Sequence, residues 1–488
     1  MPIRTTARCL ALSLLLLSPF AGCGGGGSAG NASPSAEAGA NQTVAVGTGV
    51  SLDGSRSSDP DGDTLAFQWA FVSLPAGSGA VLSTPAAATA AFTPDAEGDY
   101  VLRLAVADGR GGVASDTVTV SVGPLFAPAA ATPTGSLPEA VAIGDLNRDG
   151  RDDVVMTTSY GSDAANDYKL FVFLQGADGR LLPPVAYPTR GSYANRPKTV
   201  AIGDVSGDGR NEVVVGLSGA GIEVFPVDDS GAPGPSVLYP TADSDKIRIA
   251  DLNHDGRMDV AGIGWGTGSV SVLFQGPSGQ LAAPVSYAVT HGGYDDLETG
   301  DVNSDGLADL VVMSGQGLVP NVGVLRQMAG GGFSAPAYAS VGGQVSSSTL
   351  ARGVAVGDVT GDGRADVIVS YGGNVPRCGL GIFAQDGAGA LLPSVTLPTR
   401  DIPEAVEAAD VNGDGRKDIL VLHGGWQALG VHLQKPDGTI APELLYRIPY
   451  ASHYNPHGLA VGDIDGDGKP DVVLADANNG LVVLHGAR

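Results

Sequence analysis

DLNRDGRDD, at residues 145–153, is the stretch that decides the fold, because six further copies of it follow in the same register. These copies are DVSGDGRNE (204–212), DLNHDGRMD (251–259), DVNSDGLAD (301–309), DVTGDGRAD (358–366), DVNGDGRKD (410–418) and DIDGDGKPD (463–471). By subtraction of their first residue numbers, successive copies begin 59, 47, 50, 57, 52 and 53 residues apart. This period suits four short strands with their turns, which is one blade of a β-propeller.

Short apolar stretches flank the copies and predict the four strands of each blade. One precedes the motif, as in AVAIGD (140–145), and a β-branched run follows it, as in DVIV (366–369). A third strand is expected at LFVFLQ (170–175) and a fourth at LLPPVAYPT (181–189), with counterparts in the other copies. This order resembles the FG-GAP/VCBS repeat, the unit also found in integrin α-subunit propellers. The resemblance covers roughly residues 124–488.

The last copy predicts how the ring closes. It is followed by two strands, DVVLAD (471–476) and GLVVLH (480–485), and then the sequence stops without a fourth. A matching fourth-strand pattern, LFAPAAATPT (125–134), precedes the first copy. We therefore expect residues 123–488 to form a seven-bladed β-propeller closed by an N-terminal strand, which leaves no long exposed sheet edge.

The repeated motif has the ligand spacing of a calcium loop. Side-chain oxygens stand at positions 1, 3, 5 and 9, and position 7 adds a backbone carbonyl; Ca²⁺ accepts 6–8 such ligands at irregular angles. Glycine at position 6 permits the sharp turn, and we expect φ > 0 there. The candidate calcium ligands are Asp145, Asn147, Asp149, Arg151, Asp153, Asp204, Ser206, Asp208, Arg210, Glu212, Asp251, Asn253, Asp255, Arg257, Asp259, Asp301, Asn303, Asp305, Leu307, Asp309, Asp358, Thr360, Asp362, Arg364, Asp366, Asp410, Asn412, Asp414, Arg416, Asp418, Asp463, Asp465, Asp467, Lys469 and Asp471.

The loops have two other interpretations. An EF-hand requires helical flanks and a Glu at position 12, where these copies carry Met, Val, Gly or Leu, so it is excluded. Asp-rich turns held by Asx hydrogen bonds without metal stay open as the alternative. With calcium, up to seven ions would bind, and the loops with Ser206 and Thr360 at position 3 are expected to bind most weakly. Three carboxylates in six copies and four in the seventh make 22 of the 52 acidic residues.

The first 22 residues have the pattern of an export signal. Arg4 and Arg8 precede the apolar run Leu10 to Leu17, and Phe20-Ala21-Gly22-Cys23 resembles a bacterial lipobox. Residues 1–22 are therefore expected to be a lipoprotein signal peptide, with Cys23 lipidated and residues 23–34 acting as a Gly-rich tether. Cleavage near Ala21 without lipidation is the alternative. Because Gly24 follows the cysteine, we expect a lipid anchor in the outer membrane, on its periplasmic or surface face.

Residues 35–122 predict a separate β-sandwich. Alternating apolar positions such as Tyr100, Leu102 and Leu104 indicate half-buried strands. LDGSRSSDPDGD (52–63), Trp69 and DAEGDYVLRLAVADG (95–109) resemble the polycystic-kidney-disease (PKD) type of immunoglobulin-like domain. The resemblance implies a core position for Trp69, a tyrosine corner at Tyr100 and a spacer or weak adhesive role. Asp59, Asp61 and Asp63 form either a cation site or a solvated turn.

The net charge and the motifs restrict the classes of function that this sequence can have. The formal charge of −25 argues against a nucleic-acid partner. No complete catalytic signature is present, and Cys378 has no evident partner. We therefore expect a monomeric surface binding or adhesion module that recognises a glycan or a cell-surface protein. A polysaccharide-degrading enzyme, such as a lyase acting in the central mouth of the propeller, is the alternative.

The expected ligand face is the rim opposite the calcium loops. Loops between second and third strands and between blades share that rim, and they collect aromatic, Arg and His side chains. Flat apolar faces with a polar tip suit stacking on sugar rings or anchoring a protein partner. The alternative is that these side chains only pack between blades and plug the channel. The leading candidates are Trp265, Trp426, Tyr454 and His457.

Overall fold

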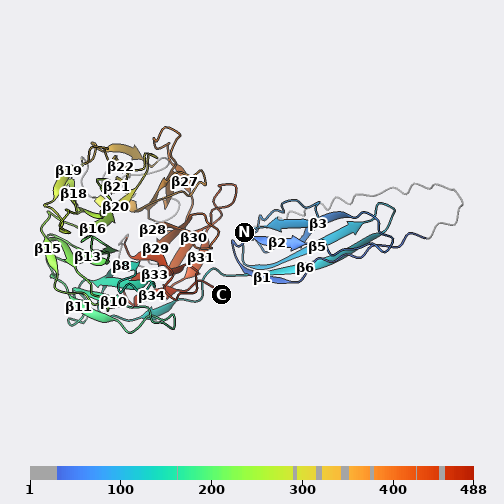
Figure 1. Ribbon diagram of the computed structural model, residues 1–488, viewed down its shortest axis with the longest axis horizontal. Coiled ribbons are helices and arrows are strands. Elements are labelled where there is room, and N and C mark those ends of the chain that lie inside the picture. The colour runs from blue at the N-terminus through green and yellow to red at the C-terminus, as the bar shows by residue number, and fades with distance from the viewer. Residues whose placement is uncertain are drawn as a thin grey trace, which may run out of the picture.

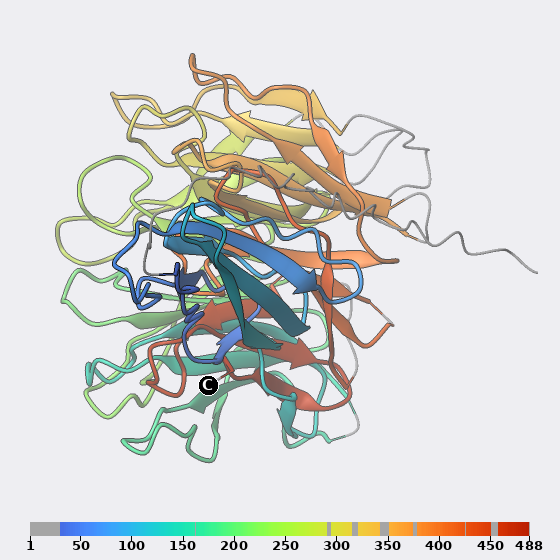
Figure 2. The same ribbon diagram turned by 90° about the vertical axis from the view of Figure 1, so that its right-hand side faces the viewer.

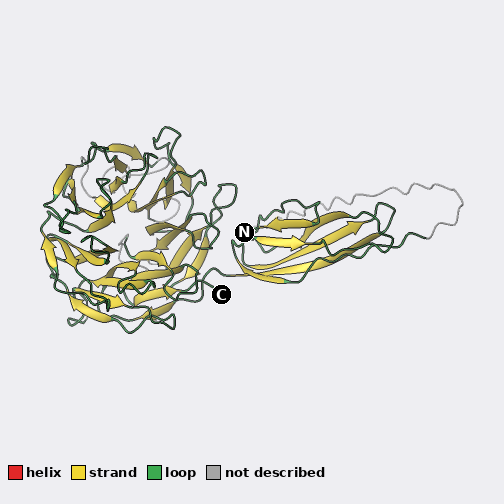
Figure 3. Ribbon diagram, viewed as in Figure 1, coloured by secondary structure: helices red, strands yellow, loops and turns green. Residues whose placement is uncertain are grey.

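The structure is a computed structural model, and it describes residues 30–161, 163–289, 294–314, 321–341, 351–373, 378–424, 426–449 and 457–487. Every regular element in this part of the chain is a β-strand, as Figure 3 shows. The predicted all-β class is therefore confirmed. Cys23 and the whole predicted signal peptide lie outside the described residues.

The N-terminal domain is a β-sandwich of two sheets. A four-stranded sheet has the order β1-β6-β5-β3, and β2 pairs with β4 in a second sheet. The strands are β1 (Gln42–Ala45), β2 (Val50–Asp53), β3 (Ala66–Ser73), β4 (Thr89–Phe92), β5 (Gly98–Ala107) and β6 (Val113–Gly123). Trp69 and Tyr100 are buried between the sheets, as expected. The Tyr100 hydroxyl accepts a hydrogen bond from the Ala96 amide at 3.0 Å, which is the backbone contact of a tyrosine corner.

The rest of the described chain forms seven four-stranded antiparallel sheets. The first contains β8 (Pro138–Gly144), β9 (Asp153–Thr158), β10 (Lys169–Phe173) and β11 (Val185–Pro188). The next three contain β12 (Pro197–Gly203), β13 (Glu212–Leu217), β14 (Gly221–Phe225) and β15 (Val237–Tyr239); β16 (Lys246–Ala250), β17 (Asp259–Ile263), β18 (Ser269–Leu273) and β19 (Val285–Ala288); and β20 (Tyr294–Gly300), β21 (Asp309–Ser314), β22 (Asn321–Leu325) and β23 (Ala337–Ser340).

The last three sheets follow the same order of strands. They contain β24 (Ala351–Gly357), β25 (Asp366–Gly372), β26 (Cys378–Phe383) and β27 (Val395–Leu397); β28 (Pro403–Ala409), β29 (Asp418–His423), β30 (Ala428–His432) and β31 (Leu444–Arg447); and β32 (Leu459–Gly462), β33 (Asp471–Asp476), β34 (Gly480–Leu484) and β7 (Ala130–Thr132). The outer strand of the seventh sheet, β7, thus comes from the segment before the first repeat. It pairs antiparallel with β34 through Ala130 and Val483.

The seven sheets lie around a common axis in a β-propeller-like ring (Figure 1). The first strand of each sheet contacts the first strand of the next, from β8 through β32, and β32 in turn contacts β8. Apolar side chains between neighbouring sheets, such as Val213 and Val155, are fully buried. The sandwich projects from one side of the ring, and Figure 2 looks onto that side.

Candidate metal loops and the opposite rim

The seven Asp-rich motifs all lie between the first and second strands of their sheets. Because the strands are antiparallel, these loops share one rim of the ring with the connections between third and fourth strands. The glycine at position 6 has φ between 79° and 85° in all seven loops, as predicted. Position 4 is also left-handed in every loop. It is glycine in four of them and Arg148, His254 and Ser304, with φ of 61–62°, in the other three.

Hydrogen bonds turn the carboxylates of each loop inward. In the first loop, Asp145 Oδ2 accepts the Gly150 amide at 2.9 Å, and Asp149 Oδ1 accepts the Arg151 amide at 3.0 Å. The same two contacts recur in the other six loops. The backbone of each loop thus fixes the carboxylates of positions 1 and 5 from inside the turn.

Position 9 joins the loop to its own sheet. Asp153 is fully buried, and its Oδ2 accepts the Leu146 amide at 2.9 Å while its Oδ1 accepts the Gln175 amide at 2.8 Å. Burial raises the pKa of Asp153, Asp259, Asp309 and Asp366 to about 6 and that of Asp418 to about 7. Without a cation, the ionised form of these carboxyl groups is therefore less favoured than that of an exposed Asp.

The donor set fits a hard cation in several loops. Carboxylate oxygens of Asp204, Asp208 and Glu212 in the second loop lie within 4.8 Å of one another. The same holds for positions 1, 3 and 5 of the seventh loop, which are all Asp. In the third loop, the position-3 atom Asn253 Oδ1 is buried without a hydrogen-bond partner. Ca²⁺ binds carboxylate and amide oxygens of this kind. The clustered carboxylates and the buried amide oxygen are therefore suitable calcium ligands.

At position 7, the ligand spacing identifies only the backbone carbonyl as a candidate ligand. The side chain at this position has a separate role. The guanidinium groups of Arg151, Arg257, Arg364 and Arg416 form ion pairs with the position-5 Asp of their own loops. These pairs partly neutralise the loop carboxylates. A bound cation and the arginine would therefore share the same position-5 carboxylate.

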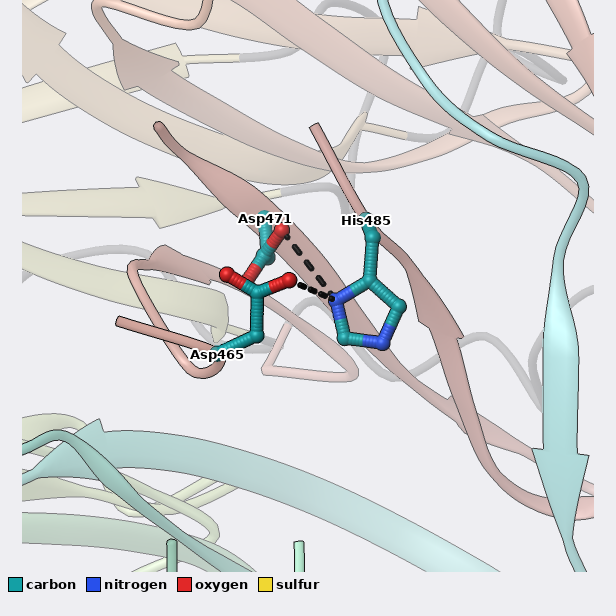
Figure 4. A group of neighbouring side chains, drawn as sticks. All are labelled: Asp465, Asp471 and His485. Carbon is teal, nitrogen blue, oxygen red and sulfur yellow. Dashed lines mark ion pairs between the residues drawn. The ribbon is translucent and has the colours of Figure 1, made fainter. Parts of the chain in front are cut away.

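The seventh loop has a further neighbour, His485, which follows β34 (Figure 4). Its Nδ1 lies 3.3 Å from Asp471 Oδ1 and 3.5 Å from Asp465 Oδ2. The neighbouring Asp471 carboxylate is the main cause that raises the pKa of His485. A cavity of about 390 Å³ adjoins this cluster. Sequence spacing alone could not place His485 here, since it lies outside the repeated motif.

The opposite rim carries exposed aromatic side chains. Trp265 is 60% exposed just after β17, and Trp426 is 46% exposed between β29 and β30. The Arg400 guanidinium lies 5.4 Å from the centre of the Trp426 ring. The ring centres of Tyr160 and Tyr193 are 5.2 Å apart. The Arg196 guanidinium lies 5.2 Å from the first of these rings and 5.3 Å from the second.

Other candidates for this rim lie elsewhere. His457 is only 4% exposed and lines the axial channel, so the expectation that it stands on the open rim is wrong. Tyr371 and His423, at the ends of β25 and β29 toward the same rim, are buried as well. Tyr454 lies outside the described residues. Within the described residues, the expected aromatic rim therefore rests on two tryptophans and one pair of tyrosines.

The axial channel holds charged side chains that the repeated motif does not include. Arg248, Glu298 and Glu407 line a cavity of about 320 Å³ together with His457. Arg248 Nη2 lies 2.7 Å from Glu298 Oε2. Counted back from the first Asp of each motif, all three occupy the third position, where the other four repeats have Ala. An alignment of the seven repeats would therefore have identified these three charged residues from the sequence.

Burial sets the ionisation of the channel groups. It raises the pKa of Glu407 to about 7. Burial, aided by the nearby Arg248 charge, lowers the pKa of His457 to about 3, so this imidazole is neutral at pH 7. Its Nε2 lies 2.9 Å from Asp296 Oδ1.

Comparisons with known proteins agree with the two kinds of domain. Residues 38–122 match a family model of the PKD domain, and residues 145–215, 251–312 and 301–369 match the FG-GAP-like repeat. The chain thus contains an N-terminal PKD domain followed by FG-GAP repeats. Within the described part of the chain, no helix has the length and hydropathy needed to cross a membrane.

Individual relatives are similar over parts of the chain. Integrin alpha pat-2 of Caenorhabditis briggsae is 30% identical over 172 residues, which is 28% of this chain and 14% of the integrin. The chain therefore spans a small part of that relative. The solution structure of the PKD domain from KIAA 1837 protein is 29% identical and covers 20% of this chain and 93% of its own, with a TM-score of 0.17. A putative 6-phosphogluconolactonase from Bacteroides uniformis is 15% identical over 79% of this chain and 98% of its own, with a TM-score of 0.45. The FG-GAP repeats indicate a propeller-type extracellular or binding module.

Proposed function

We propose that this protein is a calcium-binding lipoprotein of the cell envelope that binds a glycan or a cell-surface protein through the rim opposite its calcium loops. The observation that carries the proposal is the exposure of Trp265 and Trp426, the two tryptophans outside the PKD domain. An exposed indole gains little for the fold, whereas it supplies a large apolar face to a ligand. Tryptophan and arginine are also enriched among the residues that dominate the binding energy of protein interfaces.

The neighbouring side chains support this rim as a contact surface. Arg400 lies beside Trp426, and Arg196 lies beside Tyr160 and Tyr193, so two separate aromatic groups each carry a guanidinium. Stacking on an aromatic ring holds the guanidinium in place while leaving its hydrogen-bond donors available. Such groups can stack on a sugar ring and donate to its hydroxyl or carboxylate oxygens at the same time.

The test is the double variant Trp265→Ala with Trp426→Ala, measured against glycan arrays and native cell-surface material. Each truncation at a contact of this kind costs roughly 1–2 kcal/mol, so we expect binding at least about tenfold weaker. Val237→Ala, at a 51% exposed position on the ring, is a suitable control. Unchanged binding by the double variant, with unchanged melting in calcium, would place the site elsewhere.

The anchoring part of the proposal rests on the N-terminal sequence. The signal segment ends in Ala21-Gly22-Cys23 and is followed by the Gly-rich tether. Metabolic labelling with a fatty acid should mark the wild-type protein and leave Cys23→Ala unlabelled. Equal labelling of both proteins, or a mature N-terminus other than Cys23 by mass spectrometry, would contradict lipid anchoring.

A second candidate function, polysaccharide cleavage, is favoured by the axial channel. Arg248, Glu298 and Glu407 converge on one cavity, and a carboxyl group whose pKa lies near 7 is suited to donate or accept a proton. A panel of soluble polysaccharides, incubated with the protein and analysed for released fragments, tests this candidate. Release that Glu407→Gln abolishes would establish the enzyme, whereas binding without release supports the binding module.

A further inference from the structure

Several metal loops of the ring are covered by the neighbouring sheet. The turn that connects the third and fourth strands of one sheet places a glycine against position 3 of the loop in the sheet before it. The contact is so close that a Cβ added to the glycine would lie less than 3.0 Å from the position-3 carbonyl oxygen. The pairs of glycine and covered residue are Gly179 and Asp465, Gly279 and Ser206, Gly389 and Asn303, and Gly438 and Thr360.

The sixth loop cannot be covered in this way. Its neighbour is the seventh sheet, whose outer strand β7 comes from the N-terminal side of the ring. No turn connects the third strand of that sheet, β34, to the fourth, because β7 precedes the other three strands in the chain. Position 3 of the sixth loop, Asn412, is therefore left without a covering partner from the seventh sheet.

The PKD domain supplies that partner. A Cβ added to Gly47 would lie 2.7 Å from Asn412 Nδ2 and 2.7 Å from Leu433 Cδ1. Gly231, in the covering turn of the second sheet, has equivalent neighbours: a Cβ there would lie 2.7 Å from Leu174 Cδ2 and 3.4 Å from Asn147 Cβ. Asn147 and Asn412 both stand at position 3, and Leu174 and Leu433 both precede the Gln that binds position 9.

The turn around Gly47 is ordered by its own domain. The Gly47 amide donates to the Pro94 carbonyl at 2.8 Å, and the Thr48 amide donates to the Ala45 carbonyl at 3.2 Å. Gly47 has φ of 83°, in the left-handed region that the covering glycines also adopt. Val46 next to it is fully buried. The PKD domain thus presents a preformed turn to the sixth loop.

The connection between the domains is fixed as well. Leu125 and Phe126, directly after the PKD domain, are buried, and the Leu125 amide lies 3.3 Å from the Tyr446 hydroxyl. The rings of Phe126 and Tyr446 pack edge to face at 5.2 Å. The apolar core of the sandwich continues through these residues into the sixth and seventh sheets. The contact of Gly47 with Asn412 and Leu433 crosses the two domains, and a flexible spacer would make no such contact.

We propose that the PKD turn at residues 45–48 replaces the covering turn that the seventh sheet lacks, so that the PKD domain is a docked part of the ring. The domain then shields the sixth loop and keeps one orientation relative to the ring. In the terms of the proposed function, on which this consequence rests, the aromatic rim is held at a fixed orientation relative to the PKD domain, which the Gly-rich tether precedes.

Two glycines of the PKD domain provide a matched test in the full-length protein. Gly47→Val introduces a side chain against Asn412 and Leu433, whereas Gly62, with φ of 78°, has no neighbour within 4 Å of an added Cβ. Both substitutions place valine in the left-handed region, so they strain the backbone alike. We expect small-angle scattering to show a longer, more flexible particle for Gly47→Val and a wild-type particle for Gly62→Val.

A second variant has its substitution in the ring and leaves the sequence of the PKD domain unchanged. Leu433→Asp replaces the apolar side chain that Gly47 contacts with a carboxylate. Ala384→Asp, at the equivalent position before Gln385, is its control. We expect release of the domain in Leu433→Asp only. A wild-type protein whose two domains already move independently, or a compact particle for both Gly47→Val and Leu433→Asp, would overturn the proposal, and neither result depends on ligand binding by the rim.

Discussion

Removing calcium from the full-length protein should lower the melting temperature of the ring by on the order of 10 °C or more. At ~1 mM Ca²⁺ and a Kd of ~0.1 mM, each site adds roughly 1.4 kcal/mol to the free energy of unfolding by mass action. Seven independent sites would add about 10 kcal/mol, which is comparable with the whole stability of a typical domain. Scanning calorimetry in calcium and in chelator measures this difference.

A pair of Asp substitutions in the second sheet provides the control for this effect. Asp208 stands at position 5 of its loop, whereas Asp229 is 72% exposed and pairs with Arg210 outside the carboxylate cluster. Asp208→Asn should reduce the stabilisation by calcium, and Asp229→Asn should leave it unchanged. A ring that melts at the same temperature with calcium and with chelator would contradict a structural role for the metal.

Acidification should stabilise the calcium-free ring and destabilise the calcium-loaded one. The buried position-9 carboxyl groups, with a pKa of about 6 to 7 in five loops, have folded values above their ordinary value of 3.8. A group whose pKa is raised by folding stabilises the folded state below its unfolded pKa, and this contribution is lost as the pH rises through the folded value. Unfolding of decalcified protein in urea should therefore need more denaturant at pH 5 than at pH 8.

Calcium reverses the direction because it binds only ionised carboxylates. Protons then compete with the metal for position 9, so the loaded protein should lose stability between pH 8 and pH 5. The same carboxyl groups therefore predict opposite pH dependences of stability in the calcium-free and the calcium-loaded protein. A calcium-free protein that loses stability steadily from pH 8 to pH 5 would show that folding does not raise the pKa of the position-9 carboxyl groups.

The repeated motif predicted the loops well because their chemistry is local. Spacing within nine residues determines which oxygens converge, and the need for φ > 0 at position 6 follows from the same turn. The left-handed conformation at position 4 was not predicted. Four loops have glycine there, which indicates φ > 0, but Arg148, His254 and Ser304 in the other three give no such indication. The origin of β7 was also predictable, since the seventh copy has one strand too few.

Contacts between distant segments could not be predicted in the same way. His457 was expected on the rim, but the ring places it against Asp296, 161 residues earlier in the chain, inside the channel. The packing of Gly47 on Asn412 joins two domains and depends on the geometry of ring closure. His485 reaches the seventh loop from the end of another strand. Periodicity identifies strands and turns, whereas these neighbours depend on how the sheets are arranged.

The number of calcium ions bound per chain tests the central claim most directly. Equilibrium dialysis of the full-length protein against calcium, with the metal counted by atomic emission, gives this number without any assumption about stability. Occupation of every loop predicts seven ions per chain at saturation, with the second and fifth loops filling last. A protein that binds no calcium above a non-specific background would contradict the account.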